Sequence, residues 1–237
     1  MQFIDVSPDG RALVLEVRRD DGGEVIVMSL ADGSETVLGT GRMPVWTRDG
    51  AEVVWLDAPS KRLVAAPRAG GAVRTVAEVD LPVRRMVTAD DGRVYFHRTE
   101  HRDVQSVPLS GGVPSQVDGP EPGTALIPTS ASIRAVWAAG PRLSLLLPGE
   151  SLHDPGVWML PAGARHYGYS EGGVVWSLRG ELHRTDLRAR RDTVVARLPA
   201  TASNGYRVAA VAPDGTVYYS ALERRVRRQV MTNFGDR

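Results

Sequence analysis

The sequence from residue 42 to residue 56 reads Arg42-Met43-Pro44-Val45-Trp46-Thr47-Arg48-Asp49-Gly50-Ala51-Glu52-Val53-Val54-Trp55-Leu56. An apolar, β-prone run meets the polar dipeptide Asp49-Gly50, and a second β-prone run leaves it. Asp-Gly supplies the positive-φ corner that tight turns between twisted antiparallel strands need. The stretch therefore predicts a β-hairpin.

Similar turn signals recur along the chain at a nearly constant interval. The turn glycines are Gly10, Gly50, Gly92, Gly172 and Gly215, so the successive spacings are 40, 42, 80 and 43 residues. The double interval predicts a degenerate copy near residue 131, where Pro128-Thr129-Ser130-Ala131 separates two apolar runs. Six units of about 40 residues match the period of propeller blades.

Each unit divides into short strands separated by turn residues, and no stretch has the apolar spacing of a helix. In the first unit the pattern predicts strands over 3–6, 12–18, 24–30 and 35–38. We predict an all-β fold, namely a six-bladed β-propeller of four-stranded antiparallel blades whose last blade lacks its outer strand within this chain. One domain is expected to cover residues 1–237, with blades at approximately 1–39, 40–80, 81–120, 121–162, 163–202 and 203–237.

The strand count leaves a question about how the ring closes. The pattern yields 23 strands where six full blades need 24, and the sequence begins directly on an inner strand. Either the last blade has three strands, or residues that precede this sequence in a longer protein complete it. We favour the second, because an unpaired strand edge promotes aggregation.

Composition narrows the classes of function. The formal net charge is +1, which gives no global field to attract nucleic acid or a membrane surface. No apolar run approaches the roughly 20 residues of a membrane span. The chain has no cysteine, which excludes disulfides, thiolate metal sites and a cysteine nucleophile.

Three turn segments resemble a known repeat. They are Val6-Ser7-Pro8-Asp9-Gly10-Arg11, Val45-Trp46-Thr47-Arg48-Asp49-Gly50 and Val211-Ala212-Pro213-Asp214-Gly215. Their pattern is similar to the TolB-like, WD-related β-propeller repeat. The ending Val230-Met231-Thr232-Asn233-Phe234 resembles the final strand of propellers fused behind bacterial serine/threonine kinases or winged-helix regulators.

The resemblance implies an interaction or sensing module within a larger bacterial signalling or envelope protein, with a covalently fused upstream domain. It would be extracytoplasmic if it follows a membrane-anchored kinase or an export signal, and cytoplasmic otherwise.

Two short motifs match catalytic signatures without the context those signatures need. Gly168-Tyr169-Ser170-Glu171-Gly172 has the spacing of a nucleophile elbow, which requires a strand followed by a helix, whereas a strand-forming run follows here. His101-Arg102-Asp103 lacks the asparagine, the glycine-rich loop and the strand lysine of a kinase. We therefore predict no catalytic residue in either motif.

Histidines and acidic residues form no metal-ligand pattern. The histidines are His97, His101, His153, His166 and His183, and the i, i+4 pair at 97 and 101 lies in predicted strand and turn rather than on a helix face. Asp20-Asp21-Gly22 and Asp90-Asp91-Gly92 supply too few oxygens for calcium. No metal site and no cofactor are expected.

An arginine recurs eight residues before the turn glycine. The positions are Arg42, Arg84 and Arg207, and Arg165 lies one place away from it in the fifth unit. Here the outer strand of one blade would cross to the inner strand of the next, at the mouth of the central channel. Several arginines there would form a positive ring that suits a carboxylate, a phosphate or an acidic peptide loop. The alternative is coincidence in an arginine-rich sequence.

Two basic runs, Arg188-Ala189-Arg190-Arg191 and Arg224-Arg225-Val226-Arg227-Arg228, lack the interleaved aromatic residues of a nucleic-acid site. We interpret them as a solvated hairpin or as charge that protects an edge strand.

Two function hypotheses follow. The first is a non-catalytic scaffold that presents its channel to a protein or a small anionic ligand. The second is a catalytic propeller, either hydrolase- or lactonase-like at the channel mouth, or the gating propeller of a serine peptidase. The predicted inner strands offer Asp5, Arg165 and His166 but few carboxylates, so the scaffold is favoured over an enzyme.

Overall fold

The structure is a computed structural model in which the regular elements of the described residues are β-strands. It describes the chain except residues 1–2, 20–21, 81, 90, 99–103, 118–123, 131–132, 139–141, 147–155, 163, 171–172, 187–188, 190, 198–208, 213–215, 222–229 and 235–237. No helix long and apolar enough to cross a membrane occurs within these described ranges.

The first three sheets each contain four consecutive strands. The first sheet has β1 (Ile4–Val6), β2 (Ala12–Arg19), β3 (Gly22–Ser29) and β4 (Glu35–Thr40). The second has β5 (Arg42–Trp46), β6 (Glu52–Asp57), β7 (Arg62–Pro67) and β8 (Arg74–Glu78). The third has β9 (Val83–Thr88), β10 (Arg93–Arg98), β11 (Val104–Pro108) and β12 (Ser115–Val117).

The second half of the chain continues the same plan. The fourth sheet has β13 (Thr124–Ser130), β14 (Ile133–Ala138), β15 (Arg142–Leu146) and β16 (Gly156–Met159). The fifth has β17 (Arg165–Ser170), β18 (Gly173–Leu178), β19 (Glu181–Asp186) and β20 (Arg191–Arg197). The last sheet joins three described strands, β21 (Ala209–Val211), β22 (Val217–Ala221) and β23 (Val230–Phe234).

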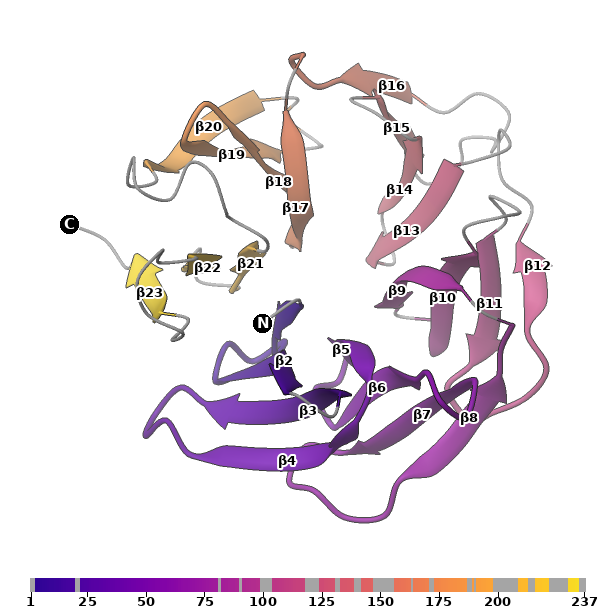
Figure 1. Cartoon of the computed structure of the whole chain (residues 1–237). Helices are drawn as coiled ribbons and strands as arrows, with labels where there is room; N and C mark the ends of the chain where they lie inside the picture. The colour runs from indigo at the N-terminus through magenta and orange to yellow at the C-terminus, as the bar shows by residue number, and fades with distance from the viewer. Residues whose placement is uncertain are drawn as a thin grey trace.

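Every described pair of neighbouring strands is antiparallel, and the sheets are set around a common centre (Figure 1). Strands such as β5, β9, β17 and β21 lie nearest the centre, whereas β4, β8, β12 and β20 lie towards the rim. The inner strand β1 contacts both β5 and β21, so the first sheet is a neighbour of the second and of the last. These sheets confirm the all-β prediction and have the arrangement of propeller blades.

Strand boundaries follow the predicted pattern to within a few residues, and two of the differences have a clear structural reason. β3 begins at Gly22 rather than at residue 24, because its pairing with β2 continues out to Arg19. The segment predicted as a turn at 128–131 is largely strand, since β13 runs through Ser130. Pro128 is tolerated there because β13 is the first strand of its sheet, where one edge needs no ladder donor.

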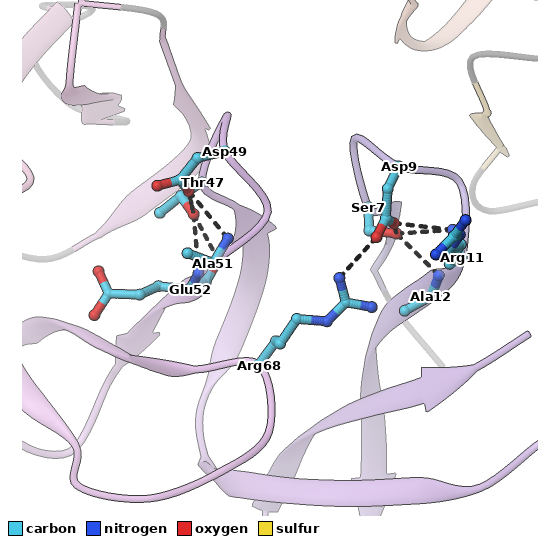
Figure 2. A network of polar contacts seen from close by, with 9 residues as sticks. All are labelled: Ser7, Asp9, Arg11, Ala12, Thr47, Asp49, Ala51, Glu52 and Arg68. Carbon is cyan, nitrogen blue, oxygen red and sulfur yellow. Dashed lines mark hydrogen bonds and ion pairs between the residues drawn. The ribbon is translucent and has the colours of Figure 1, made fainter.

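Side-chain oxygens hold the Asp-Gly hairpins in shape (Figure 2). The Ser7 hydroxyl accepts the backbone N–H groups of Arg11 at 3.1 Å and Ala12 at 2.9 Å, and it donates to Asp9. In the next unit Thr47 and Asp49 make the corresponding contacts across their own turn. The hydroxyl and carboxylate that mark the repeat therefore satisfy turn N–H groups, which is a structural role.

Apolar side chains fill the spaces between adjacent sheets. One cluster joins the first and second sheets and includes Val14, Val25 and Trp55. Another joins the second and third sheets and includes Val54 and Phe96. A third joins the first sheet to the last, with these buried members: Ile4, Leu13, Leu15, Ala212 and Tyr218. The first three blades and the last thus bury apolar side chains against their neighbours, and the first and last blades are in apolar contact.

Two tryptophans connect the second sheet to the first through their indole N–H groups. Trp46 Nε1 donates to the Asp5 carbonyl at 3.3 Å, and Trp55 Nε1 donates to the Thr40 carbonyl at 3.0 Å. Both rings are buried, at 3% and 1% exposure, so these donors would be costly to leave unpaired.

Candidate functional site

The predicted arginine positions lie at the beginnings of inner strands. Arg42 is the first residue of β5, Arg84 the second residue of β9 and Arg165 the first residue of β17. Arg42 has an exposed side chain, whereas the side chains of Arg84 and Arg165 and the whole of Arg207 lie outside what the structure describes. Convergence of the four side chains on the channel mouth therefore stays a prediction.

The backbone around Arg42 is held on the first sheet from both sides. The Gly41 N–H donates to the Gly23 carbonyl at 2.7 Å, and the Met43 N–H donates to Glu16 Oε2 at 3.1 Å. Arg42 itself pairs with Leu56 of β6, and the ladder register then shifts before Val45. A β-bulge of this kind re-aims the side chains beside it.

Asp5 is an acidic residue of the inner strand β1. It contacts Trp46 at the last position of β5, whereas Arg42 is the first residue of that strand. Its Oδ1 accepts the Val6 N–H at 3.0 Å, and its Oδ2 accepts the Trp46 N–H at 3.1 Å. The residue keeps partial exposure, but protein surrounds its carboxylate closely enough that burial raises the pKa from 3.8 to about 6. The two backbone N–H groups and the charge of Arg48 oppose this rise without cancelling it.

A second polar cluster lies at the hairpin ends of the first two sheets (Figure 2). Arg68 Nη1 reaches Asp9 Oδ2 at 2.9 Å, and its guanidinium lies 5.5 Å from the centre of the Trp46 ring. The hydrogen bond from Ser7, followed by Arg68, lowers the pKa of Asp9 to about 2. Since both charged side chains are also partly exposed, we interpret this cluster as a surface ion pair that connects two blades.

The motifs that resembled catalytic signatures have no catalytic geometry where they can be described. Ser170 ends β17 and pairs with Gly173 at the start of β18, so a strand rather than a helix follows it. Glu171, Gly172 and the segment 101–103 lie outside the described residues. The elbow signature therefore lacks the helix that its mechanism requires.

Histidine and carboxylate side chains do not gather into a metal site in the part of the chain that the structure describes. His183 stacks on Trp176 with ring centres 4.2 Å apart, and its Nε2 lies 3.7 Å from Glu181. The positions His101, His153, Asp20, Asp21 and Asp90 fall outside the described ranges, as does most of the two basic runs.

Sequence reasoning missed two residues of this region. Glu16 was assigned only to a strand, and Asp5 was noted only as an inner-strand acid. The available signal was a carboxylate inside an apolar strand run, such as Glu16 within Ala12-Leu13-Val14-Leu15-Glu16-Val17. Such a residue is rarely buried unless other groups hold it.

Comparison of the sequence with family models finds no match, and comparison with curated proteins likewise finds none. Solved structures do resemble the fold. A nidogen/laminin complex matches over 80% of this chain and 77% of its own, with 14% identity and a TM-score of 0.57. Virginiamycin B lyase from Staphylococcus aureus matches over 98% and 83%, with 10% identity and a TM-score of 0.57.

Acylaminoacyl peptidase from Pyrococcus horikoshii matches 90% of this chain at 13% identity, with a TM-score of 0.57, but this covers only 41% of the peptidase chain. These neighbours are β-propeller proteins, and they include a protein complex and two enzymes. At such low identity they establish the fold alone. The chain is therefore a β-propeller.

Proposed function

We propose that this chain is a non-catalytic, six-bladed binding propeller whose channel mouth holds an anionic group of a protein or of a small ligand. The observation that carries the proposal is Arg42, an exposed cation at the start of an inner strand, with backbone anchors on either side of it. Arg84 and Arg165 occupy the equivalent ends of β9 and β17, and Arg207 stands at the corresponding sequence position.

Arginine suits this role because its planar guanidinium donates two parallel hydrogen bonds to a carboxylate or phosphate. Repetition at the mouth would let one anionic ligand contact several blades at once. The formal net charge of +1 gives no excess of positive charge over the whole chain to attract an anion, so the proposal depends on arginines gathered at the mouth.

We also propose that the repeats are TolB-like and that the propeller is a sensing part of a larger bacterial signalling or envelope protein with a fused upstream domain. The turn segments Val6–Arg11 and 45–50 support the repeat family. The nidogen/laminin neighbour supports protein binding as a use of this fold.

The test is binding of a fluorescein-labelled hexaglutamate peptide, followed by fluorescence anisotropy at low ionic strength. Replacing Arg42, Arg84 and Arg207 together by alanine is expected to weaken binding by about threefold to about a hundredfold, since exposed charge pairs contribute about 0.2–1 kcal/mol each. The matched control replaces three other exposed arginines, Arg11, Arg62 and Arg191. Equal binding by both triple variants would refute the proposal that these arginines bind an anion at the channel mouth.

A catalytic site is the second candidate, because Asp5 is an inner-strand carboxylate whose pKa is raised to about 6. Peptidase and lyase structures among the neighbours show that this fold accommodates enzymes. Metal analysis of the purified protein separates the candidates: a stoichiometric divalent ion would favour the enzyme.

A further inference from the structure

Met43 has an unusual backbone conformation for its place in the fold. Its φ angle is +53°, and the other non-glycine residues described with positive φ are Lys61 and Arg179, which both lie in hairpin turns. Met43 instead lies inside strand β5, with only 5% of its surface exposed. A left-handed conformation within a strand persists only where surrounding contacts impose it, and such outliers gather at functional positions.

The contact that imposes this conformation comes from Glu16 on the neighbouring sheet. Glu16 is 3% exposed, and its Oε2 accepts the Met43 N–H at 3.1 Å. On the other side of Arg42, the Gly41 N–H is bound to the Gly23 carbonyl. The fit there is tight, because a Cβ at Gly23 would lie 2.6 Å from the Gly41 carbonyl oxygen.

These two anchors fix the backbone on both sides of Arg42 while leaving its guanidinium in solvent. None of the ion pairs found among the described residues involves Arg42. Burying a carboxylate and holding a β-strand residue at positive φ are both unfavourable, and a surface arginine needs neither to exist. The contact that joins the two blades therefore also sets the backbone position of Arg42.

We propose that Glu16 is the positioning residue of Arg42 for the anionic group that this arginine binds. This rests on the proposed function of the channel mouth. A fixed backbone reduces the conformational entropy that the arginine loses when it binds, so the same contact gives tighter binding than a mobile side chain would.

The test uses the full chain and the hexaglutamate probe, with four variants. Arg42→Ala should weaken binding about fivefold, which corresponds to about 1 kcal/mol, and Glu16→Leu, which removes the acceptor but leaves the arginine in place, should weaken it about twofold. Glu16→Gln retains an acceptor for the Met43 N–H and should bind as the wild type does. In an Arg42→Ala background, Glu16→Leu should change nothing further, because both changes act on one contact.

Other outcomes have definite meanings. If Arg42→Ala weakens binding but Glu16→Leu does not, the positioning role is overturned. It is equally overturned if Glu16→Leu weakens binding by the same factor with and without Arg42, since that is a general structural effect. If Glu16→Leu does not fold, Gly23→Ala displaces the same segment from its other anchor, and unchanged binding by that variant would count against the proposal.

A second measurement separates failure of this inference from failure of the proposed function. If Arg42→Ala leaves probe binding unchanged, the proposal that Arg42 binds an anion is refuted. The order of the Arg42 side chain, followed by NMR relaxation at its Nε, still reports on positioning. It should fall in Glu16→Leu and be retained in Glu16→Gln, and equal order in both variants would overturn the role of Glu16.

Discussion

Replacing Asp5 by asparagine should make the protein more resistant to unfolding as pH rises. Burial places the folded-state pKa of Asp5 at about 6, above its ordinary value of 3.8. The ionised carboxylate is therefore disfavoured in the folded protein, so the contribution of Asp5 to stability is fully present below pH 3.8 and is lost as pH rises through 6. A difference of about 2 between the pKa values corresponds to about 3 kcal/mol.

Asparagine does not titrate, so the variant escapes this loss. The asparagine side chain has one acceptor oxygen, whereas the Asp5 carboxylate accepts two N–H groups, from Val6 and Trp46. One of these N–H groups would then face the amide NH₂ group instead of an oxygen, which costs about 1 kcal/mol at every pH. Between pH 4.5 and pH 7.5 the linkage relation gives a relative gain of about 2 kcal/mol for the variant, which is an upper value because Asp5 is partly exposed.

The assay is urea unfolding followed by tryptophan fluorescence at pH 4.5, 6 and 7.5, with the free energies compared at each pH. Asp9→Asn is the control of opposite sign, because hydrogen bonding from Ser7 lowers the pKa of Asp9 to about 2. Stability from Asp9 is present above pH 3.8 and is lost only as pH falls towards 2, so this variant should be destabilising by nearly the same amount at all three pH values. If the difference between Asp5→Asn and wild type is the same at all three values, or shrinks as pH rises, the burial argument is refuted.

Two further changes test the packing that positions the site. Gly41→Ala should destabilise the fold by about 3 kcal/mol or more in urea unfolding, because its Cβ would clash with the Trp55 ring and lie 2.7 Å from the Leu56 carbonyl oxygen. Gly33→Ala, where no atom lies within 4 Å of the new Cβ, should cost about 1–2 kcal/mol from its positive φ alone, and an equal loss at both glycines would contradict the contact with Trp55. Thr185→Val should cost about 1–3 kcal/mol in thermal or urea unfolding, since it removes the acceptor of the buried Trp176 Nε1, 2.8 Å away. Thr185→Ser, which keeps that hydroxyl, should recover most of the loss.

The repeated parts of the fold were predictable because they repeat. Asp49-Gly50 and its counterparts mark hairpins through local backbone chemistry, so alternation and spacing were enough to predict the strands. Where a copy departs from the pattern, prediction was poorer. The segment 128–131 lacks Asp-Gly, and the structure extends β13 to Ser130.

The candidate site was less accessible to prediction, since its contacts join residues far apart in the sequence. Arg42 could be singled out by its position before the turn glycine. The hydrogen bond from Met43 to Glu16 spans 27 residues, and that from Trp46 to Asp5 spans 41. No local pattern encodes which carboxylate will face which N–H group when two sheets pack together.

These two hydrogen bonds join neighbouring blades, whereas the ladder hydrogen bonds of the strands build each blade. As the inner strand of its sheet, β5 has a ladder partner on one side only. Two of its N–H groups are instead taken by carboxylates of the first sheet, at Met43 by Glu16 and at Trp46 by Asp5. Such contacts fix the angle between two blades and occupy donors that a foreign strand could otherwise use. Repeat residues thus build each blade, whereas non-repeating acids join this pair, and the exposed Arg42 lies directly before the first of the two anchored residues on the strand.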